Sequence, residues 1–114
     1  MSTPDDLVTT LLEVDEHEYA RFVAHWMTRA SDLDAAARLT GNEVVDALVA
    51  AAAAMVQYER TGAEPAWTHG RGRALTKRLW HPGAPGMFPY SLVHAPGSFI
   101  VRGIVIARDA LVCV

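Results

Sequence analysis

The densest positive charge in the chain lies between two tryptophans, and its residue types suggest contact with phosphate. Trp67 and Trp80 flank it, His81 follows directly, and the segment contains His69, Arg71, Arg73, Lys77 and Arg78. Basic side chains can follow a phosphate backbone and aromatic rings can stack on bases, so the pattern is typical of nucleic-acid or phosphate contact. The alternatives are a solvated loop or an electrostatic clasp onto the acidic helices of the same chain. We favour the clasp, because only four of these residues carry a permanent charge.

The histidines raise the question of a metal site. His17 and His25 are eight residues apart with Arg21 between them, and no His-x-x-x-His or Cys-x-x-Cys pair occurs. The single cysteine, Cys113, stands near the end of the sequence. Structural metal sites draw on such paired ligands. We therefore expect neither a metal nor another cofactor.

Three other histidines, His69, His81 and His94, have arginine neighbours and could act as general acid and base in the cleavage of RNA or another phosphoester. That chemistry requires that folding bring them together, which the sequence does not display. The sequence also contains no nucleophile elbow and no carboxylate pair that would point to another reaction. We therefore lean against an enzyme and assign no catalytic residue.

Residues 35–41 resemble the first helix and turn of a helix-turn-helix motif, with Ala37 four residues before Gly41. The following helix should then present basic and amide side chains to DNA. It offers Glu43 and Asp46 instead, and no Lys or Arg before Arg60. Such a helix repels phosphates, so two packed helices joined at a glycine are the favoured interpretation.

Four helices are predicted in the first sixty residues from their start signals. Thr3, Pro4 and two acids form an N-cap, and Asp15 with Glu18 resembles a capping box. The helix after Asp15 carries an apolar stripe at helical spacing: Tyr19, Phe22, Val23, Trp26, Met27 and Ala30. A short third helix is expected over residues 31–41, and a fourth from Asn42 to about Arg60.

The middle of the fourth predicted helix, Ala47–Val56, is apolar on every side. Such a helix is usually surrounded by other helices, or it contributes a face to an oligomer. The second alternative predicts a protein interface that contains Ala47, Ala51, Ala54 and Met55.

The C-terminal part has weaker signals. Residues 73–80 could form a short basic helix, and residues 81–86 are a turn-rich loop. Two interpretations of the end remain open. One is a hairpin of Phe99–Ala107 and Leu111–Val114. The other is a helical turn that begins at Pro96 and stops at Gly103, followed by a strand over Ile104–Ala107.

A set of short motifs lies within about residues 88–111: Phe88-Pro89, Ala95-Pro96-Gly97-Ser98-Phe99, Arg102-Gly103-Ile104-Val105-Ile106 and Asp109-x-Leu111. This segment resembles the tail of small uncharacterised actinobacterial proteins, some of which belong to toxin–antitoxin or regulatory gene pairs. Ile100-Val101 departs from that pattern, where such tails are usually charged. The resemblance implies a protein partner and carries no catalytic signature.

Length and composition restrict the class of protein to which the chain can belong. The chain has 114 residues, of which 51% are hydrophobic and 20% charged, as expected for one globular domain. Its net charge of −3 conceals a division, since residues 1–64 carry −8 and residues 65–114 carry +5. One cysteine cannot form an internal disulfide, no signal peptide opens the sequence, and no apolar run is long enough for a membrane span. We expect a cytoplasmic protein that does not enter a membrane.

These observations predict a mainly α-helical single domain over residues 1–114. An N-terminal four-helix bundle (1–62, acidic) packs with a basic, loop-rich part (63–114) that contains a short basic helix and a small C-terminal strand or hairpin. The leading functional hypothesis is a non-enzymatic protein-interaction or regulatory module, antitoxin-like or phage-encoded, with a protein partner or a second copy. The alternatives are nucleic-acid binding through residues 67–81 and a small ribonuclease or nucleotide-modifying enzyme.

Overall fold

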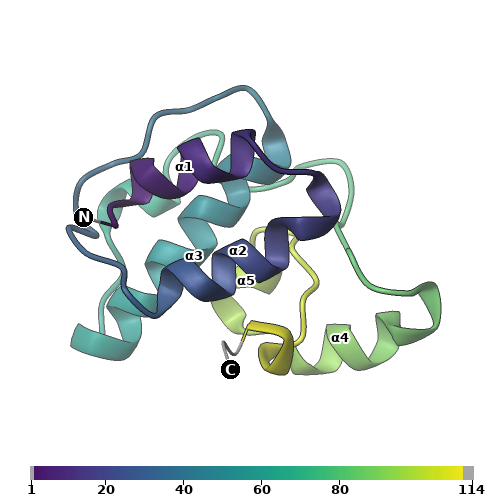
Figure 1. Cartoon of the computed structure of the whole chain (residues 1–114). Coiled ribbons are helices and arrows are strands. Elements are labelled where there is room, and N and C mark those ends of the chain that lie inside the picture. Colours follow the sequence, from purple (N-terminus) through teal and green to yellow (C-terminus); the bar gives the residue numbers. More distant parts are fainter. Residues whose placement is uncertain (1, 112–114) are drawn as a thin grey trace.

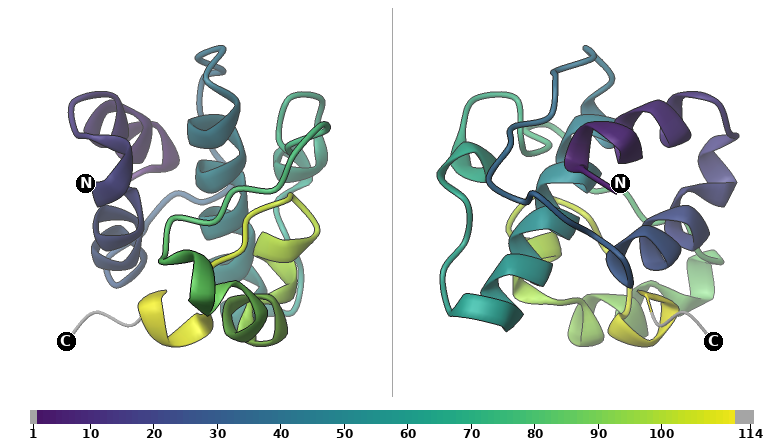
Figure 2. Two further views of the ribbon diagram at one scale, coloured as in Figure 1. Left: turned by 90° about the vertical axis from the view of Figure 1, so that its right-hand side faces the viewer. Right: turned by 60° about the vertical axis from the view of Figure 1, so that its left-hand side comes forward.

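One long helix, α3 (Glu43–Thr61), forms the centre of the molecule (Figure 1). The computed structural model describes residues 2–111, and these contain five α-helices, several single 3-10 turns and no β-strand. In the left-hand view of Figure 2, α1 and α2 lie on one side of α3 and most of the C-terminal part lies on the other, whereas the turn over residues 108–111 contacts α2. The protein is therefore mainly helical, as the sequence predicts. Among the described residues, no helix combines the length and apolar character needed to cross a bilayer.

Helix α1 (Pro4–Leu12) begins at the predicted cap. The Thr3 hydroxyl accepts a hydrogen bond from the Asp6 backbone N–H, and the Thr3 backbone N–H donates to the Asp6 carboxylate at 2.9 Å. The backbone hydrogen bond from Thr3 is the main cause of a lowered pKa for Asp6. Leu7, Val8 and Leu11 then point into the core. Local signals alone define this helix, which is why the sequence predicts it correctly.

Helix α2 (Tyr19–Met27) follows a single 3-10 turn, η1 (Glu16–Glu18). Asp15 makes no capping hydrogen bond, so the predicted capping box is wrong. The predicted buried face is largely confirmed, since Tyr19, Val23 and Trp26 are buried. The Trp26 indole donates to the Thr3 carbonyl oxygen at 3.1 Å and so joins α2 to the start of α1.

The predicted third helix over residues 31–41 is wrong, because this segment forms a turn and then an extended loop. Asp32 has a positive φ of 50°, which is incompatible with a helix. The Leu33 carbonyl accepts a hydrogen bond from the Trp67 indole at 2.8 Å, and the Ala37 carbonyl accepts one from the Arg73 guanidinium. Side chains distant in sequence thus bond carbonyls that a helix would use internally. The N-terminal part therefore contains three α-helices and this loop in place of the four predicted.

Residues 73–80 do not form the predicted basic helix either. They run extended beside residues 102–105, and the Leu75 N–H donates to the Arg102 carbonyl at 2.9 Å. Trp80 forms an isolated parallel bridge with Ile104. One bridge is not a strand, but it satisfies backbone groups that a helix would otherwise pair.

The C-terminal part follows the helical-turn interpretation and not the hairpin. Helix α5 (Gly97–Ile100) starts after Pro96, and Gly103 with φ 81° reverses the chain. Residues 104–107 are then extended and buried, although they form no strand. The turn η4 (Arg108–Leu111) lies where the hairpin needs a reversal and the start of a strand, and residues 112–114 lie outside the described part.

A short helix that the sequence reasoning missed, α4 (Phe88–His94), follows the 3-10 turn η3 (Pro85–Met87). It lies at the edge of the molecule (Figure 1). Tyr90, Leu92 and Val93 of this helix are exposed, and so is Met87 just before it. The Tyr90 hydroxyl donates to Asp109 at 2.7 Å, and this hydrogen bond raises the pKa of Tyr90.

Candidate functional site

Three of the residues predicted to contact nucleic acid make contacts inside the protein instead. Trp67 donates to the loop at Leu33, and the Arg73 guanidinium lies 4.8 Å from the centre of the Trp67 ring while it donates to Ala37. Trp80 is buried and packs on Tyr19 with ring centroids 6.1 Å apart. The two tryptophans are therefore not available to stack on bases.

The other predicted contact residues divide into two groups. Arg71, Lys77 and Arg78 are exposed. His69 Nε2 lies 2.9 Å from Glu64 Oε1, and His81 Nε2 lies 3.2 Å from Ser91 Oγ. Among residues 2–111, no ion pair joins a basic residue of this segment to an acid of α1 or α2, so the favoured electrostatic clasp onto those helices is not observed. Trp67 and Arg73 instead bond the 31–41 loop, and Trp80 packs on Tyr19 of α2.

The predicted interface on α3 lies inside the molecule. Ala47, Ala51 and Ala54 are 0% exposed, and Met55 is 8% exposed. α1, α2, α5 and the 3-10 turn η2 (Ala66–His69) all contact α3. Of the two alternatives for an all-apolar helix, the structure shows the one in which the chain's own elements surround it. A partner can reach Met55 but none of the three alanines.

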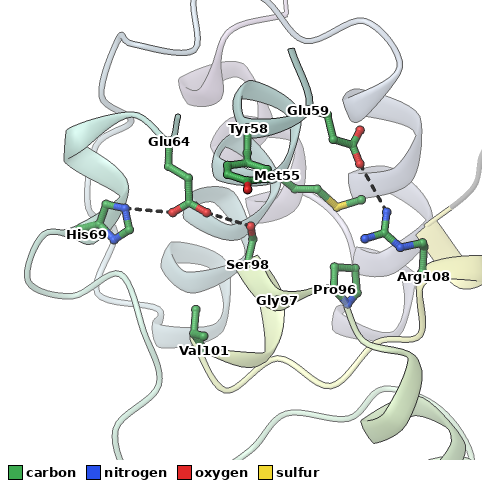
Figure 3. A pocket seen from close by; sticks show the side chains of 10 residues that line it. All are labelled: Met55, Tyr58, Glu59, Glu64, His69, Pro96, Gly97, Ser98, Val101 and Arg108. Carbon is green, nitrogen blue, oxygen red and sulfur yellow. Dashed lines mark hydrogen bonds and ion pairs between the residues drawn. The ribbon is translucent and has the colours of Figure 1, made fainter. Parts of the chain in front are cut away.

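Met55 reaches the surface in a hollow of about 510 Å³ at the C-terminal end of α3 (Figure 3). Helix α3 contributes Met55, Tyr58 and Glu59, and α5 contributes Gly97 and Ser98. The remaining lining residues are Glu64, His69, Pro96, Val101 and Arg108. Tyr58 is 58% exposed and Val101 is 73% exposed, so the rim of this hollow presents apolar surface to solvent.

Glu64 organises one wall of this hollow. Its carboxylate accepts a hydrogen bond from the Ser98 hydroxyl at 3.1 Å, and its other oxygen lies beside His69 (Figure 3). Arg102, which is 3% exposed, lies 3.7 Å from Glu64 and donates to the carbonyls of Ser98 and Thr68. Burial lowers the pKa of Arg102, and the Glu64 carboxylate opposes that shift. Glu64 therefore holds α5 against the connector and partly balances a buried cation.

A second hollow of about 470 Å³ adjoins the first and shares Met55, Glu59 and Arg108 with it. Its other lining residues are Ala24, Met27, Thr28, Val56, Arg60 and Leu111. Glu59 and Arg108, both exposed, form an ion pair of 3.3 Å that lines both hollows (Figure 3). We call the two hollows together the α3 groove.

The polar side chains around the α3 groove form neither a Ser-His-acid triad nor a histidine cluster among the described residues. Ser98 and His69 both contact Glu64, so the histidine is not placed to take the serine proton as in a Ser-His-acid triad. His69, His81 and His94 are not assembled, because His69 pairs with Glu64, His81 with Ser91, and the His94 ring packs on Tyr90. Over residues 2–111, no group of three or more His, Cys, Asp or Glu side chains could hold a metal ion.

Sequence reasoning placed only Met55 and His69 among the residues that line the groove. The groove combines Tyr58 and Glu59 on α3 with Arg108, 49 residues further on, and Glu64 with Ser98, 34 residues further on. No spacing in the sequence signals contacts over such distances. Comparisons with protein-family models, with curated proteins and with solved structures find no match to this chain.

Proposed function

We propose that this protein is a protein-interaction or regulatory module that binds a segment of a partner protein in the α3 groove. The observation that carries the proposal is the pair of adjacent hollows that share Met55, Glu59 and Arg108. Tyrosine, methionine and arginine are enriched at protein interfaces, and all three types line this groove. A protein partner is also what the resemblance to paired regulatory proteins implies.

Charge and shape favour a protein segment over nucleic acid. Glu59 and Glu64 line the first hollow, and both would repel a phosphate backbone there. The apolar surface of Tyr58, Val101 and Met55 instead suits a large apolar side chain inserted as an anchor. The first hollow therefore fits an aliphatic or aromatic residue of the partner.

The lining of the second hollow favours a partner segment that carries an acidic residue. Two arginines, Arg60 and Arg108, line it together with a single acid, Glu59. Arg60 donates to the Ala30 carbonyl, which orients the guanidinium without neutralising its charge. A partner segment with an apolar anchor and an Asp or Glu a few residues away complements both hollows.

The test is selection of short randomised peptides displayed on phage against the immobilised protein. We expect enriched peptides to share one large apolar residue with a nearby acid. Tyr58→Ala should weaken their binding by about tenfold or more, because exposed tyrosines at such rims are frequent hot spots. Arg108→Glu should also weaken peptide binding, because it removes the attraction to the acid of the peptide. High salt should weaken peptide binding by the wild type for the same reason, since salt screens that attraction.

The matched control is Leu12→Ala, which truncates an equally exposed apolar side chain on α1, outside both hollows. It should leave peptide affinity within about twofold, a difference of less than 0.5 kcal/mol. The proposal fails if no peptide is enriched, or if Tyr58→Ala and Leu12→Ala bind the selected peptides equally well. Circular dichroism confirms that each variant is folded.

A further inference from the structure

A third hollow lies between the end of η2 with the residues that follow it and the turn after α5, and its lining differs in charge from that of the α3 groove. Its volume is about 260 Å³, and it is lined by Thr68, His69, Gly70, Arg73, Ala74, Val101 and Arg102. This lining contains two arginines and a histidine but no carboxylate. It shares His69 and Val101 with the first hollow of the groove, while Glu64 lines only the groove.

Arg73 is a buried cation without an ion-pair partner among the described residues. It is 6% exposed, and none of the ion pairs within residues 2–111 includes it. Nη2 donates to the Ala37 carbonyl and the guanidinium packs on Trp67. The other terminal nitrogen, Nη1, is buried and has no hydrogen-bond partner. Buried charges in folded proteins are normally paired, so this one calls for an anion.

The second arginine of the hollow is held in place by the fold. Arg102 is 3% exposed, and its Nε and Nη2 donate to the Thr68 carbonyl at 3.3 and 2.9 Å. Nη1 donates to the Ser98 carbonyl at 2.7 Å. Its one ion-pair partner within residues 2–111 is Glu64 at 3.7 Å, and that carboxylate also contacts His69 and Ser98. Two guanidinium groups of fixed position thus line one small hollow.

From this arrangement we propose that the hollow between Arg73 and Arg102 binds a phosphate ion or the terminal phosphate of a phosphomonoester. Guanidinium groups bind phosphate oxygens through charge-assisted hydrogen bonds. Nη1 of Arg73 has no acceptor, and it gains one from the anion once the side chain turns this covered nitrogen toward the hollow. The volume is below the range typical of drug-sized ligands, which suits a small oxyanion.

The assignment also explains part of the sequence pattern. The run His69-Gly70-Arg71-Gly72-Arg73 suggested a phosphate contact, but Arg71 is exposed and does not line the hollow. The phosphate site therefore uses one arginine from this run and one from the turn after α5, 29 positions later in the sequence. The proposed site is thus formed by two arginines that are distant in the sequence and close in the folded chain.

The test uses inorganic phosphate as the probe, with sodium chloride at matched ionic strength as reference. Binding is measured by isothermal titration calorimetry and by the rise in melting temperature of the intact protein. We expect phosphate to bind and to raise the melting temperature beyond the effect of chloride. Arg73→Met should weaken phosphate affinity by about tenfold or more, whereas Arg71→Met should change it by less than about twofold.

A second pair of variants keeps the test decisive if Arg73→Met does not fold. Ala74 is exposed at the rim, so Ala74→Asp adds a carboxylate beside the hollow without disturbing the core. Ala74→Asn, of nearly the same shape but neutral, is its control. We expect the aspartate variant to bind phosphate several-fold more weakly than the asparagine variant, because like charges repel across the hollow.

Parallel titrations with AMP and with a short single-stranded oligonucleotide lacking terminal phosphates identify the source of the ligand. Binding of phosphate and AMP supports the proposal, and tighter binding of AMP identifies a nucleoside monophosphate as the better ligand. Binding of the oligonucleotide alone overturns it in favour of a nucleic-acid surface. The proposal also fails if phosphate has no effect beyond chloride, or if Ala74→Asp and Ala74→Asn bind equally.

Discussion

At the scale of single residues, some charged side chains stabilise the fold through hydrogen bonds within the chain. Asp46 is the clearest case, since it is 4% exposed in the first turn of α3. Its carboxylate accepts hydrogen bonds from the Thr40 backbone N–H and hydroxyl and from the Gly41 N–H. It also opposes the burial that lowers the pKa of Arg73. In the sequence, Asp46 is an argument against a DNA-binding helix. In the structure, the same carboxylate holds the end of the 31–41 loop against α3.

Replacing this acid should be costly. Asp46→Ala leaves the partly buried donors of Thr40 and Gly41 without their acceptor, and it removes a negative charge that opposes the effect of burial on Arg73. We expect a loss of about 2–4 kcal/mol in the free energy of unfolding, measured by urea denaturation. Glu43→Ala, an exposed acid of the same helical turn, is the control and should change it by less than about 0.5 kcal/mol. Equal effects would show that the hydrogen bonds contribute nothing specific.

At the scale of elements, chain reversals decide which surfaces meet. Gly103 has a φ of 81° between α5 and the buried residues 104–107. A Cβ atom there would lie 3.0 Å from Leu75 Cβ and 3.4 Å from the Arg78 carbonyl oxygen. The glycine is therefore required both for its backbone angle and for the close approach of the 73–80 segment. This reversal also fixes Arg102, one residue earlier, in its buried position.

Two glycine substitutions separate these effects. Gly62→Ala, at the end of α3, has a similar φ of 80° but open space around the added Cβ. It should cost about 1 kcal/mol from backbone strain alone. Gly103→Ala adds the steric contacts and should cost about 2–4 kcal/mol. Thermal and urea unfolding of both variants measure the difference. A smaller loss at Gly103 than at Gly62 would contradict the close approach.

At the scale of the whole molecule, α3 is enclosed by elements from both halves of the chain. Residues 44–56 are all buried, and the hydrophobic cluster around them includes Leu11 and Val23 from the acidic half and Phe99 and Ile104 from the basic half. The acidic and the basic half thus share one apolar core. Three of the six ion pairs among the described residues join the two halves: His69–Glu64, Arg102–Glu64 and the exposed Arg108–Glu59. Exposed ion pairs contribute little, and the shared core is large, so hydrophobic burial is the main cohesive force.

A charged residue at the centre of α3 therefore tests the architecture rather than an interface. Ala51→Asp buries a carboxylate without a partner, at a cost of several kcal/mol against a typical total stability of about 5–15 kcal/mol. We expect loss of cooperative folding by circular dichroism. Ala35→Asp, on the exposed loop, should unfold like the wild type. A folded Ala51→Asp variant would contradict the burial of Ala51 inside the chain. If light scattering then shows an oligomeric wild type and a monomeric variant, Ala51 faces another copy.

The sequence by itself determined the elements whose causes are local. The Thr3 and Asn42 caps and the end of α3 close to Arg60 depend on neighbours within a few residues. Such interactions leave a recognisable pattern in the chain, and those predictions are confirmed.

Tertiary structure alone decided the 31–41 loop, the extended 73–80 segment and the candidate sites. Trp67 bonds Leu33 across 34 residues and Arg73 bonds Ala37 across 36, and these contacts replace the hydrogen bonds of a predicted helix. Helix propensities amount to a few tenths of a kcal/mol per residue, so a few buried hydrogen bonds outweigh them. The same long-range contacts place Arg73 beside Arg102 and Met55 beside Arg108, which no spacing in the sequence could show.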